Sequence, residues 1–270
     1  MNPDLALALR LADAADEITM RNFLDVDLAV EMKADSTPVT EADRGVERAL
    51  RAVLAAERPA DAIIGEEYGG EEYGGAGLAP RCWIIDPVDG TKNFVRGVPV
   101  WATLIAMQTG GAGTVGVVSA PALNRRWWAS AGEGAYADGR AIRVSAIADL
   151  RAASFGYSSI NGWDSQGRLA GFLELSSTAQ RTRAFGDFWS HMLVAEGAFD
   201  LAAEPEVSLW DLAAVQVIVT EAGGQFTDLA GVPTAGGGSA VSSNGLLHAE
   251  ALRLLAARPT SGSTRQAALT

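Results

Sequence analysis

Two carboxylates, a glycine and a hydroxyl follow a hydrophobic run at residues 83–91, which read Trp-Ile-Ile-Asp-Pro-Val-Asp-Gly-Thr. Asp86 and Asp89 stand on either side of a proline whose fixed φ turns the chain, so both side chains can converge on one ion cluster. The backbone N–H groups of Gly90 and Thr91 follow, and unpaired donors at such a turn bind phosphate oxygens. The segment indicates metal-assisted phosphoryl chemistry.

The same residue types also occur in ordinary turns. Asp, Pro and Gly enter turns for local backbone reasons, so the segment has a second interpretation as a tight turn without any chemistry. On this segment alone the two interpretations are about equally supported. Further carboxylates that reach the same point are needed to decide between them.

Glu66 directly follows a short apolar run at residues 62–65, which reads as a strand. If that strand lies beside the one that ends at Asp86, the Glu66 carboxylate arrives at the same point. A site for two metal ions needs a bridging carboxylate and further carboxylates on each side. An isolated loop glutamate is more often simply exposed, and the duplication over residues 66–75 offers Glu71 as a competitor in the same register.

Three aspartates, Asp43, Asp187 and Asp211, stand where the sequence predicts that a helix begins. Each is a candidate for the site and also for a simple N-cap, because an aspartate there accepts hydrogen bonds from the first backbone N–H groups. Residues 40–43 have the form of a capping box, and Asp211 is a natural N-cap for the helix after it. Glu204 lies after a predicted strand, where its carboxylate would meet a hydroxylated or cationic substrate.

The charge balance limits the class of partner. The chain has 270 residues, with 21 Lys and Arg against 33 Asp and Glu, so its formal net charge is −12. This charge disfavours nucleic acid as a partner, and it would repel a phosphorylated substrate unless divalent metal lined the site. No apolar run approaches the roughly 20 residues that cross a bilayer, and the amino terminus lacks the basic segment of a signal peptide, which predicts a cytoplasmic protein with no membrane contact.

The pattern of apolar residues predicts two lobes. Residues 1–149 read as two amphipathic helices, at 4–23 and after 43, on a largely antiparallel sheet. Residues 150–257 alternate strand and helix, which is typical of an α/β lobe. The polar tail, 258–270, is predicted to be disordered. Helices of the second lobe are expected near residues 169–175, 187–196, 211–222 and 246–257.

Other motifs are excluded by their context. Residues 132–137 imitate a dinucleotide-binding fingerprint, but a turn and a β-type run follow where a helix should begin, so they predict a hairpin. His191 and His248, the only histidines, fall on predicted helices without a nearby Ser or Cys nucleophile, so a hydrolase triad is not expected. We interpret both as packing or surface residues.

Together these segments resemble the inositol monophosphatase superfamily of metal-dependent, lithium-sensitive phosphatases. The resemblance covers almost the whole chain and rests on residues 65–67, 83–94 and 210–214. It implies an α+β or α/β fold of αβαβα layers, with N-terminal helices and an antiparallel sheet joined to a C-terminal α/β lobe. It also implies a small phosphorylated alcohol as substrate and usually a homodimer.

The resemblance implies two Mg²⁺ ions that share one carboxylate. The ligands of the first would be Glu66, Asp86 and the Val88 carbonyl, and those of the second would be Asp86, Asp89 and Asp211. A third, weaker ion near Glu66 and substitution by Mn²⁺ are compatible with this set. Glu66 is preferred to Glu71 because it directly follows the strand, as the family pattern requires.

The same resemblance implies direct hydrolysis without a phosphoenzyme. Thr91, hydrogen-bonded to Asp43, would act with Glu66 to activate the attacking water, and the Gly90 and Thr91 amides would bind the phosphate. The duplicated loop at residues 66–75 is expected to act as a lid that becomes ordered when metal binds.

Within the superfamily the chain most resembles histidinol-phosphate phosphatases of actinobacterial type, enzymes of histidine biosynthesis, through residues 93–101, 183–188 and 202–206. Their substrate carries an ammonium and an imidazole, which Asp187 and Glu204 would stabilise by charge-assisted hydrogen bonds. The residues implied to contact substrate are Gly90, Thr91, Arg183, Asp187, Glu204 and Asp211. An inositol-1-phosphatase, or a non-catalytic regulator with the same fold, is the alternative.

Overall fold

Two helices with apolar faces form the first layer of the structure, a computed structural model in which residues 2–25, 28–33, 38–70 and 80–256 are described. The helices are α1 (Pro3–Asn22) and α2 (Glu41–Glu57). The Asn2 side chain caps α1, and the predicted capping box between Thr40 and Asp43 begins α2. Their apolar side chains pack together and onto the first sheet in one buried cluster.

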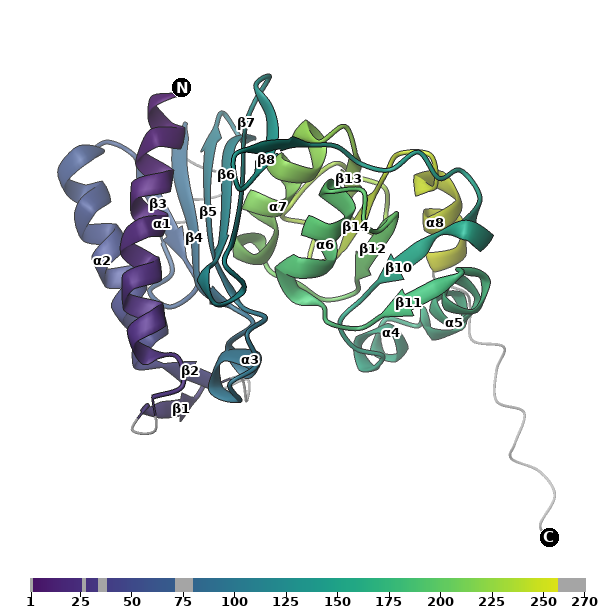
Figure 1. Cartoon of the computed structure of the whole chain (residues 1–270), viewed down its shortest axis with the longest axis horizontal. Helices are drawn as coiled ribbons and strands as arrows, with labels where there is room; N and C mark the ends of the chain where they lie inside the picture. The colour runs from purple at the N-terminus through teal and green to yellow at the C-terminus, as the bar shows by residue number, and fades with distance from the viewer. Residues whose placement is uncertain (1, 26–27, 34–37, 71–79, 257–270) are drawn as a thin grey trace, which may run out of the picture.

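The first sheet lies against these two helices (Figure 1). Its described strands are β3 (Ala62–Gly65), β4 (Arg81–Asp89), β5 (Ala102–Thr109), β6 (Ala112–Ala120), β7 (Arg125–Ser130), β8 (Gly134–Ala137) and β9 (Arg140–Ile142), in that order across the sheet. β3 pairs in parallel with β4, and the other neighbours are antiparallel, as predicted. The predicted hairpin at residues 132–137 is confirmed, since β7 turns directly into β8.

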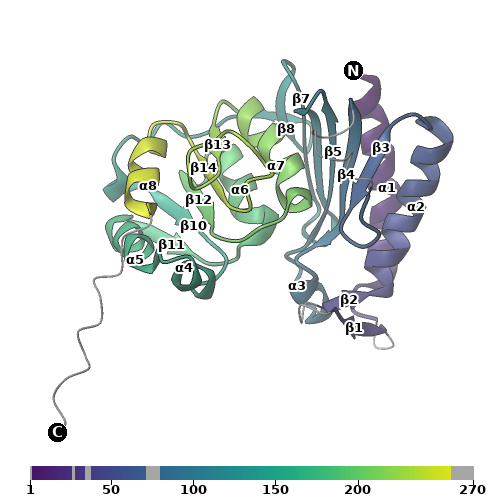
Figure 2. The same ribbon diagram turned by 180° about the vertical axis from the view of Figure 1, so that it is seen from behind.

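The middle layer consists of α6 (Asp187–Ala195) and α7 (Leu209–Glu221), which lie between the two sheets in both opposite views (Figure 2). Most of the side chains of α7 are buried, as expected for a helix that is apolar on every side. Leu212 belongs to the same buried cluster as Ile84 of β4. The second half of the chain therefore covers the first sheet, and this packing brings the start of α7 to the end of β4.

The second sheet and the helices on its outer face complete the fold. The described elements are β10 (Ser154–Gly156), α4 (Asn161–Ser165), α5 (Leu169–Thr178), β11 (Arg181–Arg183), β12 (Leu201–Glu204), β13 (Gln225–Thr227), β14 (Ala240–Ser243) and α8 (His248–Leu255). The strand order is β11-β10-β12-β14-β13, with β10 parallel to both of its neighbours and β14 antiparallel to both of its own. The predicted αβαβα layering is confirmed (Figure 1).

Several short elements connect the larger ones. They are the ribbon of β1 (Val30–Met32) and β2 (Pro38–Thr40), the helix α3 (Thr91–Val95), and the 3-10 turns η1 (Pro121–Leu123) and η2 (Leu150–Ala152). Three to five residues are too few for a periodicity to be recognised. The ribbon and α3 lie together at one end of the first sheet (Figure 1).

The division into lobes at residue 149 stays a prediction. The first sheet ends at Ile142 and the second begins at Ser154, but α7 packs on the first sheet while it belongs to the second half of the sequence. The predicted tail, 258–270, lies outside the described residues. None of the described helices has the length and the apolar character needed to cross a membrane.

Candidate active site

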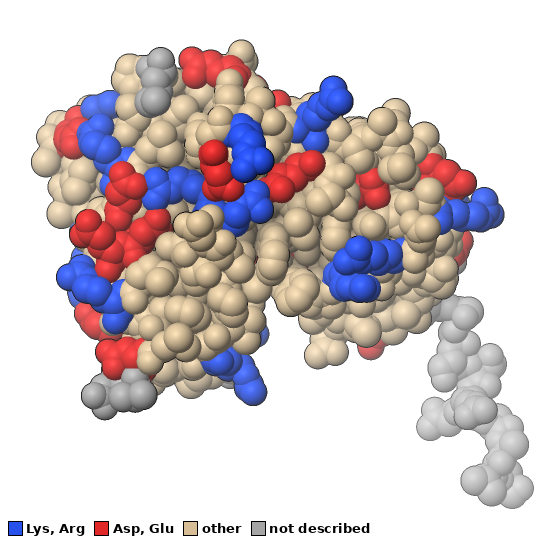
Figure 3. All heavy atoms as spheres, in the orientation of Figure 1, with Lys and Arg blue, Asp and Glu red and all other residues tan. Residues whose placement is uncertain are grey.

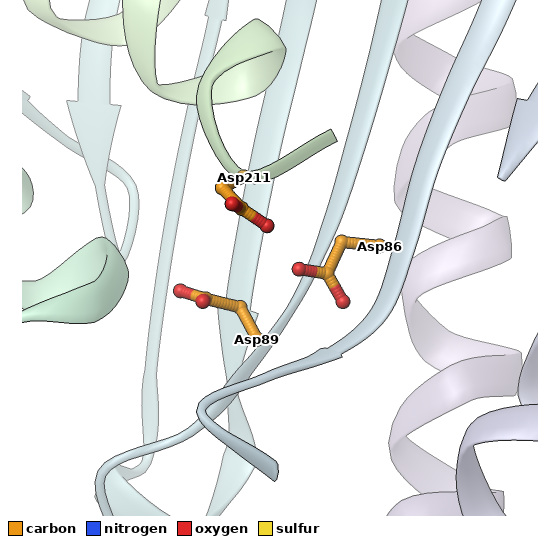
Figure 4. A group of neighbouring side chains, drawn as sticks. All are labelled: Asp86, Asp89 and Asp211. Atoms are coloured by element: carbon orange, nitrogen blue, oxygen red, sulfur yellow. The ribbon is translucent and has the colours of Figure 1, made fainter. Parts of the chain in front are cut away.

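Three aspartate side chains point toward one another between β4 and α7 (Figure 4). Asp86, Asp89 and Asp211 each offer a carboxylate oxygen within 4.8 Å of the other two. Residues three apart on a regular strand point to opposite faces of a sheet. The pairing of β4 with β5 shifts its register between Asp86 and Asp89, and this irregularity allows both carboxylates to point to the same place.

Hydrogen bonds hold the irregular segment of β4. Pro87 has no N–H for the strand ladder, and its carbonyl accepts a hydrogen bond from Thr103 Oγ1 at 2.8 Å. The Thr91 hydroxyl lies 2.9 Å from the Val88 carbonyl oxygen and 3.2 Å from Asp43 Oδ1. The contact between Thr91 and Asp43 that the resemblance implies is therefore present.

Gly90 stands between this segment and α3, and its backbone conformation requires glycine. Its φ is 87°, and a Cβ atom there would lie 2.9 Å from the Val100 carbonyl oxygen. A side chain would also approach Asp187 Oδ2, at 3.3 Å. The glycine thus lets the backbone that is predicted to bind phosphate pass close to the aspartate cluster.

Asp211 occupies a different helix position from the one predicted. The N-cap of α7 is Ser208, and Asp211 is the third helical residue, whose Oδ2 accepts a hydrogen bond from the Ser208 backbone N–H at 2.7 Å. The N-cap prediction is wrong because the helix begins one turn earlier, in a capping box. One carboxylate oxygen holds the helix start, and the other remains available to the cluster.

The cluster concentrates negative charge in a buried place. Burial, and next the neighbouring carboxylates of Glu66 and Asp89, raise the pKa of Asp86 well above its usual range. Burial raises the pKa of Asp211 to about 6. Buried like charges are stabilised only by protons or by a cation. Hard carboxylate oxygens suit Mg²⁺ or Mn²⁺, so the donor set fits the metal that the resemblance implies.

Glu66 lies beside this cluster but is not one of its three mutually close members. Its backbone N–H donates to the Ile85 carbonyl at 3.2 Å, because β3 runs parallel to β4. Its Oε1 accepts a hydrogen bond from Lys33 Nζ at 2.7 Å. In this structure the Glu66 carboxylate is therefore paired with a cationic side chain of the same chain. Glu71 lies outside the described residues.

Glu47 on α2 holds the turn that carries Glu66, a role without a signal in the sequence. Its fully buried carboxylate accepts hydrogen bonds from the Glu67 backbone N–H at 2.8 Å, from the Tyr68 N–H at 3.2 Å and from Arg51 Nε at 2.8 Å. A Cβ atom on Gly65 would lie 2.0 Å from Glu47 Oε1. The carboxylate packs directly on the backbone before Glu66.

We expect Glu47→Gln to lower the free energy of unfolding by about 1–3 kcal/mol, because the new NH₂ group would face a buried donor. Urea denaturation followed by circular dichroism measures this change. Glu57→Gln, at the far end of the same helix, removes an exposed ion pair with Arg10 and is the matched control. It should change stability by no more than about 0.5 kcal/mol. Equal effects of the two variants would contradict the anchoring role of Glu47.

Asp187 begins α6 in a conformation that is uncommon for aspartate. Its φ is 51°, and Gly186 rather than Asp187 is the N-cap residue. Asn93 Nδ2 donates to Asp187 Oδ2 at 3.2 Å, and the next backbone N–H, of Phe188, donates to Asp89 Oδ2 at 2.6 Å. Burial raises the pKa of Asp187 to about 7. Such strain at a polar residue beside a cluster of carboxylates is typical of a functional position.

Glu204 lies at the end of β12 and is also buried beside the cluster. The Ser158 hydroxyl donates a hydrogen bond to its Oε2, and burial raises the pKa of Glu204 to about 8. Glu204, Asp187 and Asp211 line one cavity of about 140 Å³, which adjoins a wider cleft of about 520 Å³ around Asp86 and Thr91. The residues predicted to bind metal and those predicted to contact the leaving alcohol therefore line adjoining cavities.

Arg183 is the one predicted substrate contact that the structure places elsewhere. Its side chain is exposed, and Nη1 donates to the neighbouring Thr182 carbonyl at 2.7 Å. It lines neither of the two cavities at the site. The prediction carried Arg183 over with its segment, but the side chains of successive residues on a strand such as β11 point to opposite faces.

Comparison with known proteins agrees with this geometry. Residues 1–261 match the model of the inositol monophosphatase family. The chain belongs to this family. Inositol monophosphatases are metal-dependent phosphatases, so the chain is a phosphatase whose aspartate cluster fits the metal requirement.

Two relatives are identical to this chain at more than half of the aligned residues. A protein of Mycobacterium tuberculosis named histidinol-phosphatase is 54% identical over 257 residues, which covers 93% of this chain and 97% of the relative. A histidinol-phosphatase of Streptomyces coelicolor is 55% identical over 262 residues, covering 93% and 96%. Among solved structures, the Thermotoga maritima IMPase is 31% identical, covers 94% of this chain and 97% of its own, and has a TM-score of 0.84.

Proposed function

We propose that this phosphatase hydrolyses L-histidinol phosphate to L-histidinol and inorganic phosphate. The observation that carries the proposal is the cavity next to the aspartate cluster, where two further carboxylates, the partly exposed Asp187 and the buried Glu204, would meet a cationic alcohol. The identity of more than half of the chain with two histidinol-phosphatases supports the same substrate. The reaction would serve histidine biosynthesis.

The aspartate cluster would hold the metal. Asp86, Asp89 and Asp211, with Glu66 and the Val88 carbonyl, are the groups proposed to bind two Mg²⁺ ions, with a third, weaker ion near Glu66 and Mn²⁺ as a substitute. Bound Mg²⁺ supplies positive charge to the phosphoryl oxygens and lowers the pKa of water. Lys33 would leave Glu66 when metal binds, since both need the same carboxylate.

The residues on the phosphate side orient the reaction. The Gly90 and Thr91 backbone N–H groups would bind the phosphoryl oxygens, and the Thr91 hydroxyl, held by Asp43, would orient the attacking water with the help of Glu66. Water forms the new P–O bond as the ester P–O bond breaks, one hydrogen of that water stays on the phosphate, and the other is lost as a proton that balances the one the leaving alkoxide takes up. No phosphoenzyme is formed in this proposal.

The substrate is tested by the purified protein in Mg²⁺ with L-histidinol phosphate, inositol 1-phosphate and glycerol 2-phosphate. We expect kcat/KM for L-histidinol phosphate to exceed the other two by roughly two orders of magnitude, because a site that hydrogen-bonds N–H groups strongly rejects esters without them. Phosphate release measures all three. Faster hydrolysis of inositol 1-phosphate would favour the alternative that the protein is an inositol-1-phosphatase. Capture of a protein partner, without Mg²⁺-dependent hydrolysis, would favour the alternative that it is a non-catalytic regulator.

We further propose a cytoplasmic homodimer without nucleic-acid or membrane partners. Basic and acidic side chains stand next to one another on the first lobe (Figure 3), as in the pairs that Arg126 forms with Asp13 and Asp16. Such mixed charge favours neither a phosphate backbone nor an anionic lipid surface. Light scattering during gel filtration tests the dimer, and the proposed lid, which extends into residues outside the described ones, is tested by hydrogen exchange with and without Mg²⁺.

A further inference from the structure

A small cavity adjoins the metal-binding aspartates. Its volume is about 140 Å³, and the polar residues that line it include Asp89, Ser158, Asp187, His191, Glu204 and Asp211. Val207 and Leu212 also contribute to its wall. A cavity of about 150 Å³ in another protein holds one benzene molecule. The space is therefore sufficient for a five-membered aromatic ring next to the proposed site of phosphate hydrolysis.

Two buried polar atoms of this lining have no hydrogen-bond partner among the described residues. They are His191 Nε2 and Glu204 Oε1. Each side chain is held at its other end: His191 Nδ1 lies 2.7 Å from Ser242 Oγ, and Glu204 Oε2 accepts from the Ser158 hydroxyl. Both residues are almost fully buried. Because a buried polar atom without a partner is costly, two of them on one cavity indicate a ligand with two polar groups.

His248 shows that burial alone does not leave a histidine nitrogen without a partner. It is as buried as His191, yet Nδ1 lies 2.9 Å from Ser243 Oγ and Nε2 lies 2.9 Å from Thr227 Oγ1. It does not line the cavity. Burial by itself therefore does not account for the unpartnered nitrogen of His191, a residue that lines the cavity.

We propose that the cavity receives the imidazole ring of the leaving alcohol and that His191 is a specificity-determining residue for it. In this proposal His191 Nε2 forms a hydrogen bond with one nitrogen of that imidazole, and Glu204 Oε1 accepts a hydrogen bond from the other. This inference rests on the proposed function, because it takes histidinol phosphate as the substrate. It reverses the interpretation of His191 as a packing or surface residue.

The chemistry of the two groups matches that of the ring. A neutral imidazole offers one N–H donor and one acceptor nitrogen, and an imidazolium offers two donors. The Glu204 carboxylate accepts an N–H in both cases, while His191 Nε2 donates or accepts according to its tautomer. Burial lowers the pKa of His191 to about 4, so the ring of this cavity-lining residue is uncharged and does not repel a cationic alcohol.

The two histidines allow a direct test by ¹⁵N NMR of the imidazole nitrogens of the whole protein in Mg²⁺. L-histidinol, added at concentrations that inhibit hydrolysis, should shift the His191 ring signals in a saturable way and leave those of His248 in place. L-alaninol, which has the amine and the alcohol but no ring, should shift neither. An unmoved His191 signal at saturating L-histidinol, or an equal shift with L-alaninol, would overturn the inference.

Two variants test the role of Nε2 separately. His191→Asn keeps a polar atom near the position of Nδ1 but removes Nε2, and His191→Gln places an amide nitrogen near Nε2. We expect His191→Asn to lower the ratio of kcat/KM for L-histidinol phosphate to that for glycerol 2-phosphate by roughly ten- to a hundredfold, and His191→Gln to restore most of it. An unchanged ratio in folded His191→Asn would contradict the inference.

The outcomes separate this inference from the proposed function. If the unmodified protein does not hydrolyse L-histidinol phosphate, the proposed function fails and the inference fails with it. If the unmodified protein hydrolyses it but the His191 signals stay in place, only the inference is overturned.

Discussion

Replacing Asp89 with asparagine is expected to lower kcat/KM for L-histidinol phosphate by roughly three orders of magnitude or more, while the chain stays folded. The carboxylate is buried and lies within 4.8 Å of the Asp86 and Asp211 carboxylates, so its charge would be needed to hold the proposed metal there. Asparagine keeps an oxygen that can accept the hydrogen bond from the Phe188 backbone N–H. The loss should therefore come from charge rather than from structure.

Thermal unfolding without metal distinguishes these two causes. Burial and the neighbouring carboxylates of Asp187 and Asp211 raise the pKa of Asp89 well above its usual range, so the metal-free protein should gain stability when this charge is removed. The Tm of Asp89→Asn in EDTA should equal or exceed that of the unmodified chain. Glu250→Gln, an exposed change on α8, is the control and should alter neither activity nor Tm. Near-normal turnover of Asp89→Asn in Mg²⁺ would show that the metal site is wrongly assigned.

Metal removal should have the second large effect, and its size should depend on pH. Mg²⁺ at a hundred times its Kd stabilises the folded state by about 2.7 kcal/mol, which corresponds to a rise in Tm of roughly 5–10 °C for a chain of this size. Calorimetry with Mg²⁺ and with EDTA, at matched ionic strength, measures the difference. The same titration in Asp89→Asn should give a much smaller rise.

The pH dependence follows from the raised pKa values of the site. Burial raises the pKa of Asp211 to about 6, of Asp187 to about 7 and of Glu204 to about 8, whereas in the unfolded chain these groups titrate near pH 4. Between these limits the folded state binds more protons than the unfolded state, so the stability of the metal-free protein falls as the pH rises from about 5 to 8. Mg²⁺ should remove most of this slope. A metal-free Tm that rises over this range would contradict the electrostatic description of the site.

Much of the site could be predicted from short segments. The two carboxylates of β4, the glycine after them and the capping box at Asp43 are local signals, because turn and cap residues are selected by the backbone within a few positions. The helices α1 and α2 were also predictable from periodicity, and α6 and α7 from the alternation of strand and helix and from the residues at their ends. Other features of the site were not predicted. Asp211 lies in the first turn of α7 rather than at its cap, because Ser208 is the N-cap. Glu47 supports the Glu66 turn from another element, and such a non-local contact has no signal in the sequence. The substrate contact of Arg183, whose side chain is exposed, stays a prediction.

The sequence by itself determined the class of chemistry. Asp86, Asp89, Gly90 and Thr91 lie within six residues, and a net charge of −12 is compatible with a phosphorylated substrate only if cations line the site. Only the tertiary structure decided how these groups meet. A shifted register turns both β4 carboxylates to one side, and the burial of α7 between two sheets brings Asp211 to them. Whether a buried nitrogen such as His191 Nε2 has a partner depends on packing between distant elements, which no local pattern encodes.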